Sequence, residues 1–216
     1  MRHVSFLPLA ALACGAFAPS MACAQDVNVT LASSYVDSNF NDRFSDEPAL
    51  QIDASYNLDS HLYVSAYAYT GFKKPFADNS SEYGFEAGGQ WELSKKATAT
   101  LSAGRYANYL GQGFGNGDWY VKAALTYGRA SVSASALHGE SNTVLLNISY
   151  QLPVTARFTV TPSVVYFTAQ NKLNPAVALD YRLTEKLSVG GTFVLPKNED
   201  TGSRTFYAVA TLTYSF

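Results

Sequence analysis

The stretch Phe206-Tyr-Ala-Val-Ala-Thr-Leu-Thr-Tyr-Ser-Phe216 decides the fold class. Every second residue in it is apolar or aromatic, and most of the residues between them are small or carry a hydroxyl group. A repeat of two residues is typical of a β-strand, because successive side chains point to opposite faces of a sheet. One face of this strand therefore suits hydrocarbon, and the other suits water.

The last residue of the strand is the aromatic Phe216. An alternating strand that ends in Phe resembles the C-terminal strand of bacterial outer-membrane β-barrels. The resemblance implies that the barrel-assembly machinery is a partner of this protein and recognises it through this strand. The alternative is the edge strand of a soluble β-sandwich, so the membrane interpretation requires the rest of the chain to repeat the pattern.

The N-terminus is typical of an export signal. Arg2 supplies a positive charge, an apolar run covers residues 4–18, and Ala22-Cys23-Ala24 forms a cleavage site of small residues. We therefore expect a signal peptide over residues 1–24 and an outer-membrane β-barrel domain over residues 25–216. A lipoprotein anchored through Cys14 or Cys23 is the alternative, but neither cysteine has a leucine three residues before it.

Composition excludes several classes of protein. Both cysteines lie in the expected signal, so the mature chain has no thiol and no disulfide. Removing Arg2 with the signal changes the formal net charge from −2 to −3, which excludes a broadly basic nucleic-acid-binding protein. The mature chain also has no apolar run close to the roughly 18–20 residues that a membrane-spanning helix needs.

The alternation recurs along the whole mature chain. It predicts strands at residues 27–36, 49–58, 61–70, 82–93, 96–107, 118–127, 130–137, 143–152, 157–167, 175–183, 186–195 and 206–216. Short turns alternate with longer polar loops between them, as in barrels whose two rims face different compartments. We therefore predict an all-β fold, a transmembrane antiparallel up-and-down β-barrel of about twelve strands.

Two of these strands raise particular questions. Pro162 lies inside the strand at residues 157–167 and has no N–H group for the ladder, so we predict a β-bulge there. Both faces of the strand at residues 61–70 carry apolar or aromatic side chains. The pattern therefore does not decide which of the two faces of this strand points into the barrel.

Aromatic residues recur at one end of every second strand. Each lies on the apolar face just before a short turn or the chain end, and the set is Tyr56, Trp91, Tyr127, Tyr150, Tyr181 and Tyr214. Rings at one height around a barrel favour the membrane interface and form an aromatic girdle. A soluble sandwich has no reason to place them there.

The polar faces carry most of the charged residues of the strands. Charges on the outer face are costly in hydrocarbon, so we expect these side chains to line the lumen. The candidates are Asp53, Glu82, Glu86, Glu92, Asp118 and Asp180 among the acids, and Lys122, Arg157, Arg182 and Lys186 among the bases. They either pair across the lumen and plug it, or line water and set ion preference.

No catalytic, cofactor or metal site stands out. His138-Gly139-Glu140-Ser141 contains a base, an acid and a hydroxyl group, but these are neighbours on one short loop, whereas a catalytic triad converges in space. The glycines at 111, 113, 115 and 117 lack the strand–turn–helix context of a phosphate-binding loop. The two histidines of the mature chain, His61 and His138, are too few and too far apart to suggest a metal site.

The first hairpin resembles the TorF-like porin family of Gram-negative bacteria. The resemblance rests on Ser33-Ser34-Tyr35-Val36 and on Asp46-Glu47-Pro48-Ala49-Leu50-Gln51, and it covers about 25 residues. This chain departs from the family after Val36, where it has Asp37-Ser38-Asn39. The resemblance implies a porin-like role.

We therefore expect a monomer in the outer membrane, in contact with its lipid and lipopolysaccharide, that acts as a passive channel for small hydrophilic solutes. A non-conducting barrel for membrane structure or surface binding is the first alternative. An outer-membrane lipid-modifying hydrolase is the second.

Overall fold

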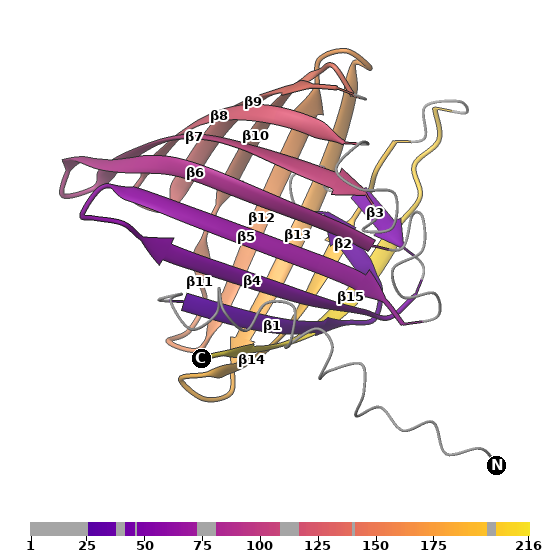
Figure 1. Ribbon diagram of the computed structural model, residues 1–216. Helices are drawn as coiled ribbons and strands as arrows, with labels where there is room; N and C mark the ends of the chain where they lie inside the picture. The colour runs from indigo at the N-terminus through magenta and orange to yellow at the C-terminus, as the bar shows by residue number, and fades with distance from the viewer. Residues whose placement is uncertain are drawn as a thin grey trace.

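The computed structural model describes residues 26–37, 42–45, 47–72, 81–108, 117–139, 141–197 and 202–216. The expected signal peptide at residues 1–24 lies outside these ranges. The regular elements in the described ranges are all β-strands (Figure 1). None of the described residues belongs to a helix long and apolar enough to cross a membrane.

The strands follow one another along the chain with short or long connections. They are β1 (Asp26–Ala32), β2 (Tyr35–Asp37), β3 (Asp42–Ser45), β4 (Ala49–Asn57), β5 (Leu62–Gly71), β6 (Ser81–Ser94), β7 (Ala97–Asn108), β8 (Asp118–Tyr127), β9 (Ala130–His138), β10 (Val144–Tyr150), β11 (Leu152–Pro153), β12 (Phe158–Phe167), β13 (Lys172–Arg182), β14 (Leu187–Val194) and β15 (Tyr207–Ser215).

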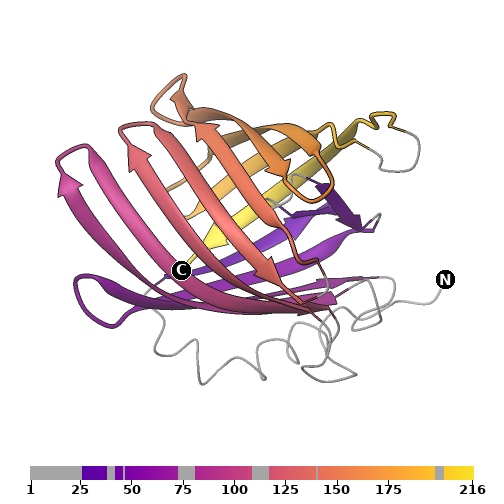
Figure 2. The same ribbon diagram turned by 90° about the horizontal axis from the view of Figure 1, so that it is seen from above.

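The strands close into one antiparallel barrel (Figure 2). Each strand of the wall pairs with its neighbours in sequence, and β1 pairs with β15 to close the ring. The seam carries Val29 opposite Tyr214, and the N–H of Phe216 donates to the carbonyl of Val27 at 3.0 Å. The predicted twelve-strand antiparallel β-barrel is confirmed.

Large apolar side chains cover the outer surface. Phe85, Trp119 and Ile148 are 43%, 54% and 57% exposed, which no soluble core would allow. The six girdle aromatics are also exposed, and each lies close to the end of its strand next to the short-turn rim. The outer face and its girdle are therefore as the sequence predicts.

The first predicted strand, at residues 27–36, is in fact divided. β1 ends at Ala32, and the chain turns into the β2–β3 hairpin. The side-chain oxygen of Ser33 accepts the N–H of Ala210 at 3.0 Å, while the N–H of Ser33 donates to the carbonyl of Ala210. A hydroxyl group thus replaces the next main-chain partner, and the ladder with β15 stops there.

The predicted bulge at Pro162 is wrong. Pro162 pairs with Val177 in a continuous register along β12 and β13. On its other side, Ser149 pairs with Ser163 and Leu152 pairs with Val160, which is also one register. Because Pro162 lacks an N–H group, the ladder is interrupted between β10 and β11 without an inserted residue.

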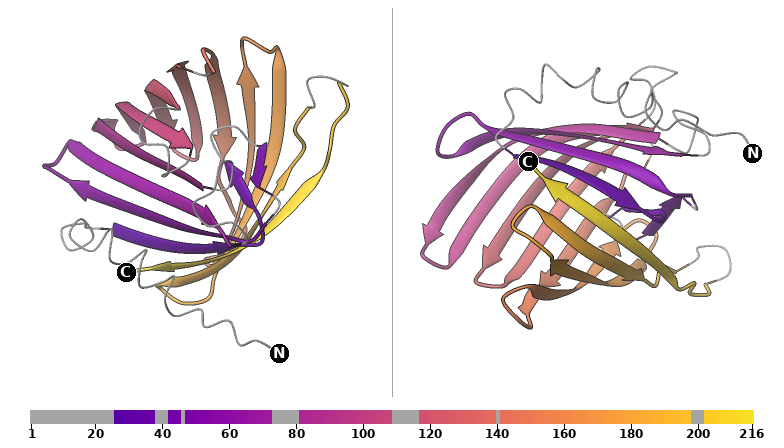
Figure 3. Two further views of the ribbon diagram at one scale, coloured as in Figure 1. Left: turned by 45° about the vertical axis from the view of Figure 1, so that its right-hand side comes forward. Right: turned by 90° about the horizontal axis from the view of Figure 1, so that it is seen from below.

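The interior is filled toward the long-loop rim. The β2–β3 hairpin lies within the ring of strands at that end (Figures 1 and 3). Inward-facing side chains near it are buried, namely Ala49, Tyr69, Leu137, Leu145, Val165, Phe167, Val194 and Val209. Near the short-turn rim, by contrast, the inward-facing Asp180 and Arg182 are exposed. The barrel is thus open toward its short turns and constricted toward its long loops.

Candidate functional site

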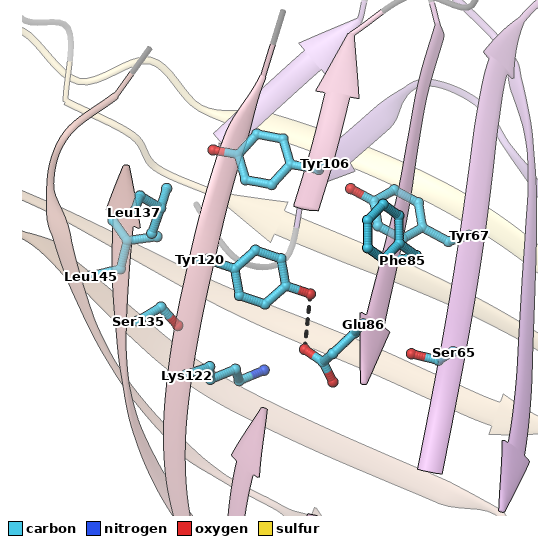
Figure 4. A pocket seen from close by; sticks show the side chains of 10 residues that line it. All are labelled: Ser65, Tyr67, Phe85, Glu86, Tyr106, Tyr120, Lys122, Ser135, Leu137 and Leu145. Atoms are coloured by element: carbon cyan, nitrogen blue, oxygen red, sulfur yellow. Dashed lines mark hydrogen bonds between the residues drawn. The ribbon is translucent and has the colours of Figure 1, made fainter. Parts of the chain in front are cut away.

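A cavity of about 180 Å³ lies against the inner face of β5–β10 (Figure 4). Most of its lining side chains are polar or aromatic, and they include Ser65, Tyr67, Glu86, Tyr106, Tyr120, Lys122, Ser135 and Leu137. It adjoins the buried cluster of Leu137, Leu145, Val165 and Phe167, against which the rings of Tyr106 and Tyr120 pack. The cavity therefore lies next to the constricted part of the lumen, on the side of the short turns.

Tyrosine hydroxyl groups bind the carboxylates of this wall. Glu86 on β6 accepts one hydrogen bond from Tyr63 at 2.5 Å and another from Tyr120 at 2.9 Å. Tyr67 donates to Glu82 in the same way. These bonds fix both partners, since a hydrogen bond to a charged group is stronger than one between neutral groups.

A second carboxylate site lies at the long-loop end of the wall. Asp118 is 1% exposed. It accepts a hydrogen bond from the hydroxyl group of Tyr106 at 2.7 Å and one from the N–H of Ser141 at 2.9 Å. The carboxylate thus joins the start of β8 to the connection that follows β9.

Glycines on neighbouring strands leave room for these rings. Gly84 lies directly opposite Tyr67, and Gly88 lies directly opposite Tyr63. A Cβ atom at Gly84 would collide with the Tyr67 ring, and one at Gly88 would lie 2.8 Å from the Tyr63 hydroxyl oxygen. The rings therefore lie flat on the wall instead of standing into the lumen.

The same arrangement occurs twice along the wall. Tyr63 covers Gly88 and binds Glu86, and one repeat further along Tyr67 covers Gly84 and binds Glu82. In sequence this is an alternation of Glu and Gly on the inward face of β6 with tyrosines spaced to match on β5. The repeat gives this wall a regular row of carboxylates and phenol groups.

Lys122 is the basic residue of the cavity. Its side chain extends from β8 toward Glu86 (Figure 4). A second lysine, Lys172, lies at the start of β13, where its ammonium nitrogen is 5.3 Å from the centre of the Phe167 ring. Lys172 therefore belongs to the wall on the far side of the ring from Glu86 and Lys122.

The structure brings together only some of the residues that the sequence proposes for the lumen. Glu82, Glu86 and Lys122 lie together on the wall of the cavity side. Asp53 lies two strands away on β4, and the amide of Gln51 donates to both of its carboxylate oxygens, at 2.9 and 3.0 Å. Asp118 joins the wall through Tyr106.

The other candidates lie toward the short-turn rim. Glu92 is exposed near the end of β6, and Asp180 and Arg182 are exposed near the end of β13. Arg157 and Lys186 fall just before β12 and β14, so they belong to short turns at the rim and not to the wall. A role for any of these residues in conduction stays a prediction.

The sequence did not identify the tyrosines as part of the site. The alternation does not decide which face of the strand at residues 61–70 points inward, and the register of β5 places Tyr63, Tyr67 and Tyr69 inward. The available signal was the match between tyrosines and glycines on paired strands. Reading it requires the register, which the sequence pattern alone does not provide.

The His138–Ser141 stretch does not converge on a catalytic arrangement among the residues described. His138 pairs with Trp119 and is exposed on the outer face. Ser141 instead donates its main-chain N–H to Asp118. In the described ranges, no group of three or more His, Cys, Asp or Glu side chains could hold a metal ion.

Comparison with known proteins finds likeness in structure. No protein-family model matches this sequence, and no curated protein matches it either, so membership of the TorF-like family is not confirmed. The fold is similar to that of the KdgM porin, with a TM-score of 0.63 and 9% identity over 88% of this chain and 99% of that one. It is also similar to the NanC porin, with a TM-score of 0.57 and 9% identity over 88% and 98% of the two chains.

A third similar structure is the Acinetobacter baumannii outer membrane protein Omp33. The TM-score is 0.52, with 12% identity over 88% of this chain and 96% of that one. At these identities the likeness establishes a shared barrel fold.

Proposed function

We propose that this chain is an outer-membrane, porin-like channel through which small hydrophilic solutes diffuse passively. The observation that carries the proposal is the contrast between the two faces of one closed barrel. Outward side chains such as Trp119 and Ile148 are large, apolar and exposed, whereas the inner face presents carboxylates, phenol groups and hydroxyl groups around a cavity. Hydrocarbon outside and water inside is the arrangement of a membrane pore.

The structural neighbours support the same proposal. KdgM and NanC are described as porins, and Omp33 as an outer membrane protein. The match covers nearly the whole length of each of them. Their solutes are not carried over to this chain, because a likeness at 9–12% identity shows a shared fold alone.

The cavity wall favours cations and neutral solutes over anions. Among the described residues of this wall, Glu86 and Lys122 line the cavity with opposite charges, and the buried Glu82 and Asp118 make the sum of the wall negative. Fixed charges on a pore wall attract ions of opposite sign. One KdgM structure is described as a complex with oligogalacturonate, a chain of sugar carboxylates. The carboxylates of this wall would repel such a ligand.

Planar-bilayer recording of the refolded mature chain tests this function. We expect discrete conductance steps and, in a salt gradient, a reversal potential that indicates cation preference. Glu86→Gln should lower that preference, because it removes a charge from the cavity wall. Glu185→Gln is the matched control, since Glu185 lies in the exposed turn between β13 and β14. A barrel that inserts but never conducts would contradict the proposal.

A closed structural barrel is the second candidate, and one observation favours it. Inward-facing residues next to the long-loop rim are almost fully buried, with Val165 at 0% and Val194 at 1% exposure. A lumen filled at one end would carry no current. The recording separates the two candidates, because only the channel gives conductance steps.

A further inference from the structure

One cation lies on the outer, apolar face of the barrel wall. Arg105 on β7 pairs with Phe85 on β6 and with Trp119 on β8, and both of these side chains are exposed on the outside. Among the described strand residues, Arg105 is the only Lys or Arg whose register places it on this face. Such a charge is costly in hydrocarbon, so its position calls for a physical reason.

Aromatic rings hold the guanidinium group in place. The central carbon of the Arg105 guanidinium lies 5.4 Å from the centre of the Trp119 ring. The Phe85 ring packs edge-on against Trp119, with centroids 5.9 Å apart and planes at 82°. A cation over the face of an indole is attracted by the ring, most strongly where water is scarce.

The row continues across one more strand. Trp119 pairs with His138 on β9, and His138 is exposed. Phe85, Arg105, Trp119 and His138 therefore form one continuous row across four neighbouring strands, which we call the outer row. It places two nitrogen-bearing side chains on either side of an indole.

The depth of the outer row fits the headgroup region of a membrane. Arg105 lies eight residues beyond Ala97, the first residue of β7 at the short-turn rim. At about 3.3 Å per residue and a strand tilt of about 45°, this is a rise of roughly 19 Å. The apolar band of such barrels is about 25 Å tall, so Arg105 lies toward its far edge, where charged headgroups begin.

We propose that the outer row binds a phosphate group of a membrane lipid on the long-loop side. The Arg105 guanidinium donates charge-assisted hydrogen bonds to phosphate oxygens, for which its planar array of N–H groups is suited. His138 supplies a further nitrogen donor, and the rings of Phe85 and Trp119 contact the apolar part of the same lipid. The proposal requires the barrel to lie in a membrane, and it holds whether or not the barrel conducts.

Two lipids could supply this phosphate, namely lipid A of lipopolysaccharide and an ordinary anionic phospholipid. The mature chain is refolded in neutral detergent and titrated with lipid A, with dephosphorylated lipid A, or with phosphatidylglycerol. The Trp91→Phe variant leaves Trp119 as the only tryptophan, so its fluorescence reports on the outer row. The unfolding midpoint of the unaltered chain is measured in parallel.

We expect lipid A to shift the Trp119 emission and to raise the unfolding midpoint, and dephosphorylated lipid A to do neither. Arg105→Gln should weaken lipid A binding about tenfold or more, because it removes charge-assisted hydrogen bonds. Lys122→Gln is the matched control and should bind normally, since Lys122 lies on the next strand but faces the cavity. Equal responses to phosphatidylglycerol and lipid A would support the phosphate site and identify phospholipid as a sufficient source.

Equal binding of lipid A and dephosphorylated lipid A would overturn the proposal, as would unchanged binding by Arg105→Gln. The first comparison uses no variant at Arg105, so it remains decisive even if that substitution prevents folding. If the refolded chain binds lipid A through its phosphates but gives no conductance steps, the channel function is contradicted and the proposed phosphate site is still supported.

Discussion

Glycines opposite the lumen tyrosines set how far the rings reach into the pore. Gly84 gives the Tyr67 ring its place on the wall, and Gly104 does the same for Tyr120, whose hydroxyl oxygen would lie 2.6 Å from an added Cβ atom. Tyr120 on β8 reaches Glu86 on β6 only by crossing this glycine. The residue without a side chain thus determines the contact between two strands that are not neighbours.

Gly84→Ala should displace the Tyr67 ring from the wall. We expect the variant to lose roughly 1–3 kcal/mol of stability, as overpacked sites commonly do, and to conduct less because the ring moves into the lumen. Denaturant unfolding and single-channel recording measure the two effects. Gly191→Ala is the control, because its Cβ would meet only the Val209 carbonyl oxygen, at 3.3 Å. Equal conductance in both variants would show that the ring position does not limit the pore.

Asp59 fixes the turn between β4 and β5. Its carboxylate accepts the N–H of His61 at 2.6 Å and that of Leu62 at 2.7 Å, and these bonds lower the pKa of Asp59 below its usual 3.8. A lowered pKa means that the folded turn prefers the carboxylate. Its contribution is therefore complete above pH 3.8 and is lost as the pH falls through the lower, folded-state pKa.

We expect the Asp59 carboxyl group to titrate below pH 3.8 in NMR spectra of the refolded chain. The amide protons of His61 and Leu62 should exchange faster once it is protonated. Asp59→Asn has no group to titrate there and is the control. A titration midpoint at or above the usual value would mean that the turn gains nothing from the charge.

At the scale of elements, three short turns use the same chemistry. Thr155 accepts the N–H groups of Arg157 and Phe158, and Thr184 accepts those of Lys186 and Leu187, as Asp59 does in its own turn. An oxygen that binds the main chain two and three residues ahead favours a tight reversal. These residues explain why one rim has only short connections.

The β2–β3 hairpin is the element that we expect to limit the pore. Replacing residues 35–45 with a short flexible linker should raise single-channel conductance by roughly twofold or more, since it widens the filled end of the lumen. Deleting Gly202 and Ser203, in another connection of the same rim, is the control. Unchanged conductance after removal of the hairpin would assign the constriction to the wall residues themselves.

The strands were predictable because their alternation reflects a physical contrast between lipid and water. The departures occur where a single group changes the ladder, as Ser33 ends β1 and Pro162 interrupts β10. Strand β13 begins at Lys172 and not at the predicted residue 175, because a tight turn lets Lys172 pair with Phe167. The polar residues Lys172 and Asn174 favour a loop in the sequence pattern, but in the structure they belong to β13 and their side chains are buried in the interior.

The candidate site was only partly predictable. Glu82, Glu86 and Lys122 followed from charge and alternation, because a strand exposes one face to lipid. The tyrosines on β5 did not, because a ring can face lipid or water and only the pairing with Gly84 and Gly88 decides. The hairpin inside the ring was also missed, since nothing in an alternating pattern tells which loop folds inward.

At the scale of the whole molecule, two properties of the barrel are separate. The apolar outer face with its outer row concerns the membrane, and the carboxylate-rich inner wall concerns what passes through. Successive side chains of one strand alternate between the two faces: Val121 faces outward, and the next residue, Lys122, faces the cavity. This alternation is the central physical claim, and the absence of cysteine from the expected mature chain makes it accessible to site-specific labelling.

The most direct test places single nitroxide labels at residues 121, 122, 123 and 124 of β8, and at residues 147 and 148 of β10, in lipid bilayers. Dissolved oxygen collects in lipid, whereas a water-soluble nickel complex reaches only aqueous surfaces. We expect oxygen to relax the labels at residues 121, 123 and 148, and the nickel complex to relax those at residues 122, 124 and 147. Accessibility without a repeat of two, or with the two faces exchanged, would contradict a membrane-spanning barrel with a wet interior.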